Sequence, residues 1–324
     1  MKSQTNNLRN GFNKFFYYRE FQIGLILIIG IIVLGATSPF LSAGNISSIM
    51  MGIVNQAIIG IGMTLLLVGG GFDLSVGSVF ALGGIVASIF AERGVNIVLS
   101  MILGVIAGLI IGIINGIVVV KIGVNPLIAT LGMLGIARGI VLVITHGLAP
   151  SDLPESFKII GQNSILNIQI PIYIMLFLII ISAILLSYTK FFRQYYFIGG
   201  NEKAALLTGI KTKLLKFIMY VITSGLAAFA GIIFTSRIGA SSLQMGEGLE
   251  LSVISACLIG GCSLEGGKGS IFGTFLGVLL LGIVLNAFSL LGFSIYWQRI
   301  VQGIILIGAV STDSMIMKRG GGSL

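Results

Sequence analysis

Residues 95–120 read VNIVLSMILGVIAGLIIGIINGIVVV, a run of 26 residues without a charged side chain. A helix rises about 1.5 Å per residue, so this run can cross the roughly 30 Å apolar layer of a bilayer. Glycine recurs at every fourth position of the run, at Gly104, Gly108, Gly112 and Gly116. One helix face therefore lets neighbouring backbones approach closely in lipid. We predict a membrane helix packed tightly inside one bundle, in preference to a dimer seam.

The composition of the whole chain agrees with this interpretation. Of 324 residues, 56% are hydrophobic and only 9% are charged, with a mean hydropathy of +1.10. Soluble domains carry roughly 25% charged residues, so a soluble globular protein is excluded. The net charge of +9 could suggest nucleic acid, but the basic residues lie in short segments between apolar runs. We therefore expect no nucleic-acid partner.

Ten apolar runs predict an all-α, polytopic transmembrane bundle. They are residues 22–40, 48–70, 74–91, 95–120, 126–145, 171–189, 214–236, 250–263, 270–291 and 294–312. The runs at 74–91 and 250–263 are short for a bilayer, so either could be a half-span or a re-entrant helix. The run at 22–40 ends in small residues that resemble a signal-peptide cleavage site. Its length and the runs that follow favour an uncleaved first helix.

The basic residues predict the orientation of the bundle, because positive charge collects on the cytoplasmic side of membrane proteins. They concentrate before the first run, in the long central interruption and after the last run. Both termini are thus expected in the cytoplasm of a multi-pass protein of the cell membrane. The predicted organisation is a cytoplasmic N-terminal segment at 1–21, one transmembrane domain at 22–312, and a cytoplasmic tail at 313–324.

The central interruption, residues 190–216, reads KFFRQYYFIGGNEKAALLTGIKTKLLK. Its six basic residues face a single acid, Glu202, which assigns it to the cytoplasm. Asn201–Leu207 has the composition of a short helix. Glycines bound that helix on both sides, at Gly199, Gly200 and Gly209. On composition alone, a solvated basic loop is favoured over a docking element for a soluble partner.

Residues that could support catalysis or bind a metal are scarce. Cys257 and Cys262 lie in or beside an apolar run, and the only histidine, His146, has no nearby ligand partner in the sequence. Gly261–Gly269 differs from a phosphate-binding loop, because cysteine stands at 262 and glycine at 269 where glycine and Ser or Thr are required. We predict no catalytic residue, no metal, no cofactor and no nucleotide site, so ATP-driven transport would need a second chain.

A faint internal repeat aligns Leu66–Phe80 with Leu258–Phe272 and places Asp73 over Glu265. Transporters are often built from repeated halves with their site at the repeat interface. An acid at a glycine-rich break indicates a gate or a carboxylate that caps a helix, and we favour capping for both acids. The candidates for a pathway or gate are Asp73, Ser75, Arg138, Glu250 and Glu265.

Arg138 lies inside an apolar run. A lone arginine facing lipid would cost at least about 2.5 kcal/mol on insertion scales. Arg138 is therefore expected to face the bundle interior and to bind a carboxylate or backbone carbonyls. The alternative is an arginine whose side chain reaches the membrane interface.

Four segments carry a family resemblance, in one order along the chain. They are Gly70–Ser78 (GGFDLSVGS), Pro126–Gly139 (PLIATLGMLGIARG), Gly200–Ile210 (GNEKAALLTGI) and Gly246–Gly269 (GEGLELSVISACLIGGCSLEGGKG). These segments resemble permease subunits of sugar-importing ATP-binding cassette (ABC) transporters of the ribose, xylose and autoinducer-2 type. The family commonly has Asp in place of Ser252 and Thr in place of Cys262. These departures leave the transported solute open.

The resemblance implies a permease that works with three kinds of partner in membrane lipid. They are a cytoplasmic ATP-binding subunit, an extracytoplasmic solute-binding protein, and a second permease copy or a sister permease. In the family, the segment at 190–213 contains the coupling helix that sits in a groove of the ATPase. The residues implied in coupling are Gly199, Gly200, Asn201, Glu202, Ala204, Ala205 and Gly209. Ala204 and Ala205 are expected to face the groove, because small side chains permit close approach.

The alternative from another class is a self-contained secondary transporter driven by protons or sodium. Such a transporter needs ionisable groups buried near the middle of the membrane. In the apolar runs this chain offers chiefly Arg138. A proton relay is therefore poorly supported by the sequence.

Overall fold

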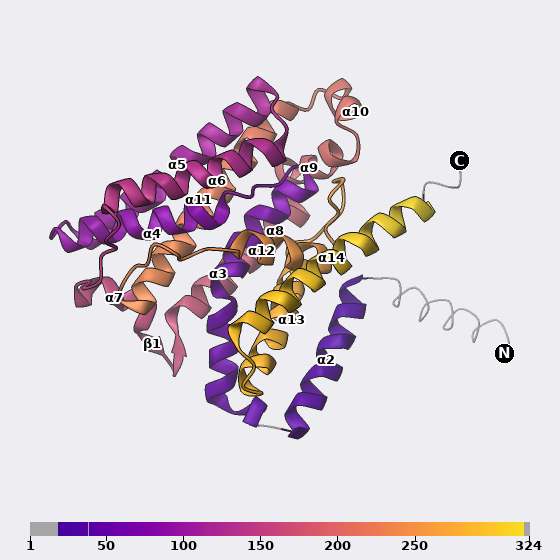
Figure 1. Ribbon diagram of the computed structural model, residues 1–324. Helices are drawn as coiled ribbons and strands as arrows, with labels where there is room; N and C mark the ends of the chain where they lie inside the picture. Colours follow the sequence, from indigo (N-terminus) through magenta and orange to yellow (C-terminus); the bar gives the residue numbers. More distant parts are fainter. Residues whose placement is uncertain (1–18, 38, 321–324) are drawn as a thin grey trace.

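The computed structural model describes residues 19–37 and 39–320. Over these residues the fold is a helical bundle with one short β-hairpin, which confirms the predicted fold class (Figure 1). Positions 1–18, 38 and 321–324 lie outside the described residues, and with them most of the predicted N-terminal segment.

Every predicted apolar run coincides with a helix. The helices are α2 (Arg19–Thr37), α3 (Ala43–Val68), α4 (Val76–Glu92), α5 (Ile97–Gly116) continued by the π-helical η2 (Ile117–Ile122), α6 (Pro126–Thr145), α8 (Ile170–Tyr188), α11 (Thr212–Ile238), α12 (Leu249–Ile259), α13 (Ile271–Leu290) and α14 (Ile295–Gly320). Among the described residues, α3, α5 with η2, α6, α8, α11 and α13 are long and apolar enough to cross a membrane. The runs at 74–91 and 250–263 form shorter apolar helices, α4 and α12.

Two helices end at other positions than the apolar runs that predict them. The first helix ends at Thr37, and Pro39–Leu41 forms a separate 3-10 turn, η1. Helices usually end at or before the residue that precedes a proline, because that residue is sterically biased away from the helical region. At the other end of the chain, α14 continues through most of the segment predicted as a tail, residues 313–324.

The elements outside the bundle lie at its two ends. On one side, α7 (Glu155–Gln162) precedes an antiparallel hairpin of β1 (Ser164–Ile165) and β2 (Ile168–Gln169). On the other side, α9 (Lys190–Gly200) leads into the six-residue helix α10 (Glu202–Leu207). Figure 1 shows α10 and the pair of α7 and β1 at opposite ends of the molecule, as the predicted topology requires.

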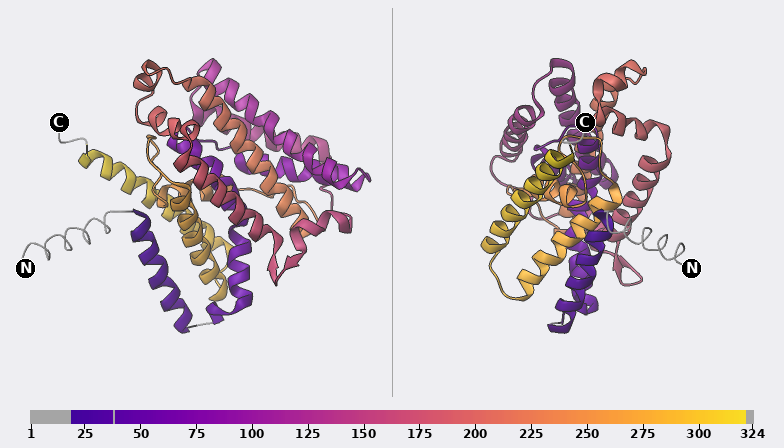
Figure 2. Two further views of the ribbon diagram at one scale, coloured as in Figure 1. Left: turned by 180° about the vertical axis from the view of Figure 1, so that it is seen from behind. Right: turned by 90° about the vertical axis from the view of Figure 1, so that its right-hand side faces the viewer.

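α3 forms the centre of the bundle. In its most apolar window 83% of residues are buried, against 22% for α6 and 28% for α8, so those two helices leave most of their surface exposed. α2 lies at the edge and packs on α13, where Ile23 and Leu27 join Ile283 in a separate buried cluster. The left view of Figure 2 shows α2 at the edge of the molecule, set apart from the main body.

The glycine repeat of α5 packs against α4 and α11. All four of its glycines are buried. A Cβ at Gly104 would lie 2.5 Å from the carbonyl oxygen of Gly83, and a Cβ at Gly108 would lie 2.4 Å from the Cβ of Ala228. The three helices could not approach this closely with larger residues, so the predicted packing inside one bundle is confirmed.

Candidate functional site

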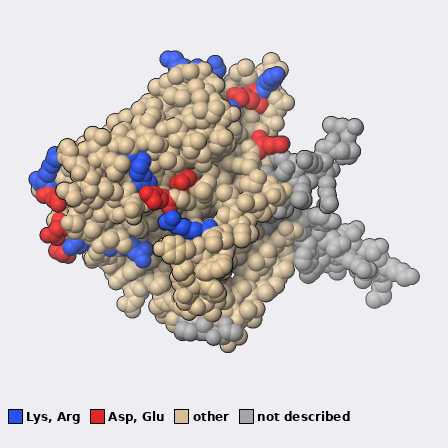
Figure 3. Space-filling view, viewed as in Figure 1, with Lys and Arg blue, Asp and Glu red and all other residues tan. Residues whose placement is uncertain are grey.

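A polar cavity of about 270 Å³ lies between α3, α4, α11, α12 and α14, and we call it the outer cavity. It is lined by Asn55, Gln56, Phe80, Phe234, Gly246, Glu247, Gly248, Leu249, Ser252, Ile295, Gln298, Arg299 and Gln302. A second cavity of about 240 Å³ shares Glu247, Gly248, Ser252, Arg299 and Gln302 with it. Figure 3 shows a hollow near the middle of one face, with acidic and basic side chains gathered at its rim.

Three half-buried amides in the outer cavity, Asn55, Gln56 and Gln302, make no hydrogen bond to another described residue. Buried amides normally have hydrogen-bond partners, and each offers two donors and an acceptor. These side chains are therefore free to bind water or a solute rich in hydroxyl groups. The sequence analysis missed them, although Asn55 and Gln56 are adjacent amides in an apolar run.

Arg138 holds the loop that leads into α12. Its Nη1 donates to the carbonyl oxygens of Leu243 at 2.7 Å and Met245 at 3.0 Å. The prediction that Arg138 binds backbone carbonyls is confirmed, whereas its depth relative to the membrane interface stays a prediction. Residues 246–248 of the same loop line the outer cavity, so Arg138 shapes that cavity indirectly. A role for Arg138 as a gate stays a prediction.

Glu250 lies half-buried in the first turn of α12, close to Gly77 of α4. A Cβ at Gly77 would lie 2.3 Å from Oε2 of Glu250 and 2.3 Å from the carbonyl oxygen of Gly246. Only glycine at position 77 lets α4 approach α12 here. An acid in the first turn also interacts favourably with the positive end of the helix dipole. Like Arg138, Glu250 is absent from the residues that line the outer cavity.

Asp73 is fully buried at the break between α3 and α4. Its Oδ1 accepts hydrogen bonds from the backbone nitrogen of Ser75 at 2.8 Å and from Ser75 Oγ at 2.6 Å. Its Oδ2 accepts from Nδ2 of Asn115 at 3.1 Å. Nδ2 of Asn115 also donates to Ser75 Oγ at 2.9 Å. The carboxylate thus ties the start of α4 to the end of α5, through an asparagine that sequence reasoning did not identify.

Glu265 has a different environment from Asp73, although the repeat aligns the two acids. Its side chain is exposed, in the loop between α12 and α13. α13 is capped by Ser270, whose Oγ accepts from the backbone nitrogen of Gly273 at 3.0 Å. The prediction that Glu265 caps a helix was therefore wrong, because a serine next to the helix start does so.

The Asp73 network allows capping to be tested separately from charge. Asp73→Asn keeps an oxygen for the Ser75 N–H but turns an NH₂ group toward the NH₂ of Asn115. We expect this clash to lower membrane abundance by an amount equivalent to about 1–3 kcal/mol of stability, the cost of a buried donor without a partner. The double variant Asp73→Asn/Asn115→Asp restores a donor opposite an acceptor.

We expect uptake and abundance to recover in that double variant if Asp73 organises the helix break. Both are measured together in membranes. Full abundance with no uptake in the double variant would show instead that the charge at position 73 itself is needed.

The short helix after Asn201 was predicted correctly, but two features of its surroundings were not. Oδ1 of Asn201 caps α10 by accepting from the backbone nitrogen of Ala204 at 3.0 Å, and Gly209 follows with a φ of +85°. Gly199 and Gly200, expected as a break before this helix, form the last turn of α9 instead. In residues 190–200, Phe192, Tyr195 and Tyr196 pack against the hydrophobic core, whereas Phe191 and Phe197 are exposed.

The prediction that Ala205 lies on the partner-facing side of α10 was also wrong. Ala205 is only 3% exposed and packs on its own chain, whereas Leu206 is 61% and Leu207 is 90% exposed. Ala204 and Glu202 are exposed as expected, and Glu202 forms an ion pair with Lys216. Beside α10 an open groove of about 880 Å³ is lined by Gly200, Asn201, Glu202, Lys203, Leu206, Lys211, Thr212, Lys213 and Leu214.

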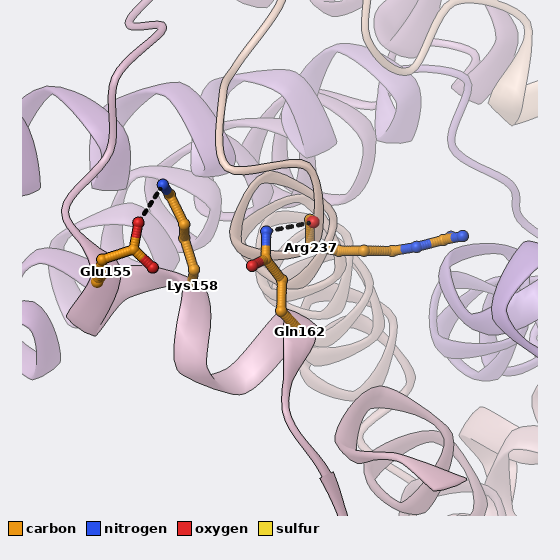
Figure 4. A network of polar contacts seen from close by, with 4 residues as sticks. All are labelled: Glu155, Lys158, Gln162 and Arg237. Carbon is orange, nitrogen blue, oxygen red and sulfur yellow. Dashed lines mark hydrogen bonds and ion pairs between the residues drawn. The ribbon is translucent and has the colours of Figure 1, made fainter. Parts of the chain in front are cut away.

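The extracytoplasmic end of α11 is held by α7 (Figure 4). The backbone nitrogen of Gly161 donates to Ser236 Oγ at 2.8 Å, and Nε2 of Gln162 donates to the carbonyl oxygen of Arg237 at 3.0 Å. Lys158 and Glu155 form an exposed ion pair at 2.7 Å on the same helix. α7 therefore covers the end of α11 and forms a defined surface on this side.

Comparison with known proteins identifies the family. The sequence profile of the family described as branched-chain amino acid transport system / permease component matches residues 45–310. The ribose import permease protein RbsC of Bacillus subtilis (strain 168) is 40% identical over 293 residues, covering 90% of this chain and 91% of that protein. RbsC of Escherichia coli (strain K12) is 35% identical and covers 97% of this chain and 99% of that protein.

The L-arabinose transport system permease protein AraH of Escherichia coli (strain K12) is 36% identical, over 90% of each chain. No solved structure matches the chain significantly. The profile covers most of the chain, and these relatives align over nearly their whole length. The chain therefore belongs to the family of permease components described as branched-chain amino acid transport system / permease component.

Proposed function

We propose that this chain is the transmembrane permease subunit of an ABC importer and carries a monosaccharide or a closely related solute across the cell membrane. An extracytoplasmic binding protein delivers the solute, and ATP hydrolysis on a separate subunit drives transport. The observation that carries this proposal is the outer cavity with its three amides, which make no hydrogen bond within the part of the chain that the structure describes. Amides pair with vicinal hydroxyl groups as both donor and acceptor, which suits a sugar.

The family description names branched-chain amino acids, whereas the similar relatives are named for ribose, L-arabinose and D-allose. Glu247 and Arg299 at the outer cavity would suit the two charges of an amino acid. The amides and the identity to sugar permeases over nearly the whole chain favour the sugar. A branched-chain amino acid is the second candidate.

The ATP-binding subunit would dock on α10 and the groove beside it. Lys203, Lys211 and Lys213 surround that groove, and Leu206 and Leu207 project from α10. A partner surface with an apolar pocket and acidic rim complements this arrangement. Within the coupling loop, Asn201 caps the start of α10 and Gly209 follows its end. Ala204 lies on the exposed side of the helix. Hydrolysis belongs to the partner in this proposal, and the permease contributes no ATPase residue.

The remaining partners would meet other surfaces. The solute-binding protein would approach the side of α7 and the hairpin, where the α7 contacts hold the end of α11. A second copy of the chain, or a sister permease, would complete the translocation pathway. Asp73, Ser75, Arg138 and Glu250 would support the pathway by holding the break between α3 and α4 and the loop before α12. Glu265 lies on the cytoplasmic side and would have no contact with solute.

The experiment is affinity purification of the chain from detergent extracts of its own host, followed by reconstitution into proteoliposomes. We expect a nucleotide-hydrolysing subunit to copurify, and D-ribose uptake to require ATP and the binding protein. Uptake of L-leucine in place of D-ribose would favour the second candidate.

Uptake driven by a proton or sodium gradient without ATP, and without a copurifying ATPase, would contradict the proposal. That result would support a secondary transporter. The family assignment favours the ABC permease over this alternative.

A further inference from the structure

Three segments that lie far apart in the sequence meet next to α10. They are the end of α3, the end of α9, and the loop of residues 260–269 between α12 and α13. The backbone nitrogen of Gly267 donates to the carbonyl oxygen of Val68 at 2.9 Å. Tyr196 Oη donates to the carbonyl oxygen of Gly269 at 2.8 Å. We call this contact region the cytoplasmic junction, and Figure 1 shows α9 beside the end of α3.

Gly199 lies at the centre of the cytoplasmic junction, where there is no space for a side chain. A Cβ at this position would lie 1.9 Å from the carbonyl oxygen of Val68 and 2.4 Å from the backbone nitrogen of Gly267. Its own Cα lies 2.9 Å from the position that a Cβ on Gly266 would take. The neighbouring Gly200 is exposed, and a Cβ there would meet nothing within 4 Å. A side chain therefore fits at Gly200 but not at the adjacent Gly199.

The cytoplasmic junction connects α10 to the outer cavity through rigid elements. Asn201 alone separates α10 from α9, and α9 contacts the 260–269 loop through Tyr196 and Gly199. That loop continues directly from α12, whose first residues, Leu249 and Ser252, line the outer cavity. A displacement of α10 along this path must move α12, because packed helices transmit displacement with little compression.

We propose that Gly199 and Tyr196 are positioning residues that transmit movement of α10 to α12 through the 260–269 loop. This inference rests on the proposed function, since it assumes that an ATPase moves α10. It assigns to α9 a role in coupling that does not involve contact with the ATPase. The docking surface on α10 and the cytoplasmic junction are therefore separable by mutation.

The test compares Gly199→Ala with Gly30→Ala, the same change in α2 at a helical glycine where a Cβ would meet nothing within 4 Å. Gly199→Ala is expected to reduce ATP-dependent D-ribose uptake by about tenfold or more, since misplacements near 1 Å commonly have effects of that size. Membrane abundance and retention of the ATPase should be unchanged, because α10 is intact. Gly30→Ala should match the wild type in all three measurements. Normal uptake in Gly199→Ala would overturn the inference.

A native cysteine reports directly on the loop. Cys262 is fully buried in the 260–269 loop, with its Sγ 3.6 Å from Thr274 Oγ1, and Cys257 is the only other cysteine in the chain. In Gly199→Ala the displaced loop should expose Cys262 to a membrane-permeant maleimide, measured in the purified permease with Cys257→Ala in the background. Labelling no faster than in Gly30→Ala would show that Gly199 does not position the loop.

If Gly199→Ala does not accumulate in the membrane, Tyr196→Phe decides the question. This variant removes one hydroxyl, and with it the hydrogen bond to Gly269, without adding volume. Uptake below half of wild type at equal abundance supports the inference, and wild-type uptake overturns it. Failure of the proposed function would look different, because no ATPase would then copurify with the wild-type chain.

Discussion

Replacing Leu207 with aspartate is expected to abolish uptake while the permease stays folded in the membrane. The side chain of Leu207 is 90% exposed on α10, so aspartate there should change folding stability by no more than about 0.5 kcal/mol. In the proposed complex the leucine fills an apolar pocket of the ATPase, and a carboxylate would be desolvated there without a partner. Losses of 2 kcal/mol or more at such anchors weaken binding about 30-fold. The measurement is retention of the ATPase on the affinity-purified permease, together with uptake.

The control for this prediction is Leu148→Asp, the same change at a residue that is 81% exposed beyond the other end of the bundle. It should leave ATPase retention unchanged. Ala205→Glu is not a docking test, because Ala205 is 3% exposed and glutamate there would bury a charge within the permease. We expect that variant to be lost from the membrane. Full ATPase retention by Leu207→Asp would remove the docking assignment of α10.

Removing two amides from the outer cavity is expected to block transport without affecting assembly. In Asn55→Leu/Gln302→Met the lining keeps nearly the same volume but loses its hydrogen-bonding groups. A sugar hydroxyl left without a partner costs about 1–3 kcal/mol, so two such losses should slow D-ribose uptake at least tenfold. The measurement is initial uptake rate in proteoliposomes, at equal amounts of permease and ATPase.

A matched control is Gln244→Met, which makes the same chemical change at an exposed glutamine in the loop before α12. Gln244 does not line the outer cavity. Its variant should transport normally. If the double variant transports as fast as the control, the outer cavity is not the sugar pathway, even where the chain remains an ATP-driven permease.

The site was only partly predictable from the sequence. Asp73 stood out as an acid at a glycine-rich break between two apolar runs, and Arg138 stood out because charged residues are rare within such runs. The expectation that Arg138 has polar partners followed from the cost of placing it in lipid. Asn115 and Gln302 did not stand out. A single amide is tolerated in a membrane helix on any face that finds a partner, so its presence alone does not indicate which neighbour it meets.

The sequence by itself determined the protein class, the positions of the apolar helices, and the short helix capped by Asn201, whereas the orientation of the helices across the membrane stays a prediction. These features depend on chain length, local composition and charge, which act over a few residues. Only the tertiary structure decided which faces of the helices are inside, including the burial of Ala205 and the exposure of Leu207. In a membrane protein the lipid-facing and core-facing side chains are both apolar, so hydrophobic periodicity does not distinguish them. The outer cavity combines Asn55 of α3 with Gln302 of α14, and the cytoplasmic junction combines Val68 with Gly267. These residues lie about 200 or more positions apart in the sequence, and packing alone brings them together.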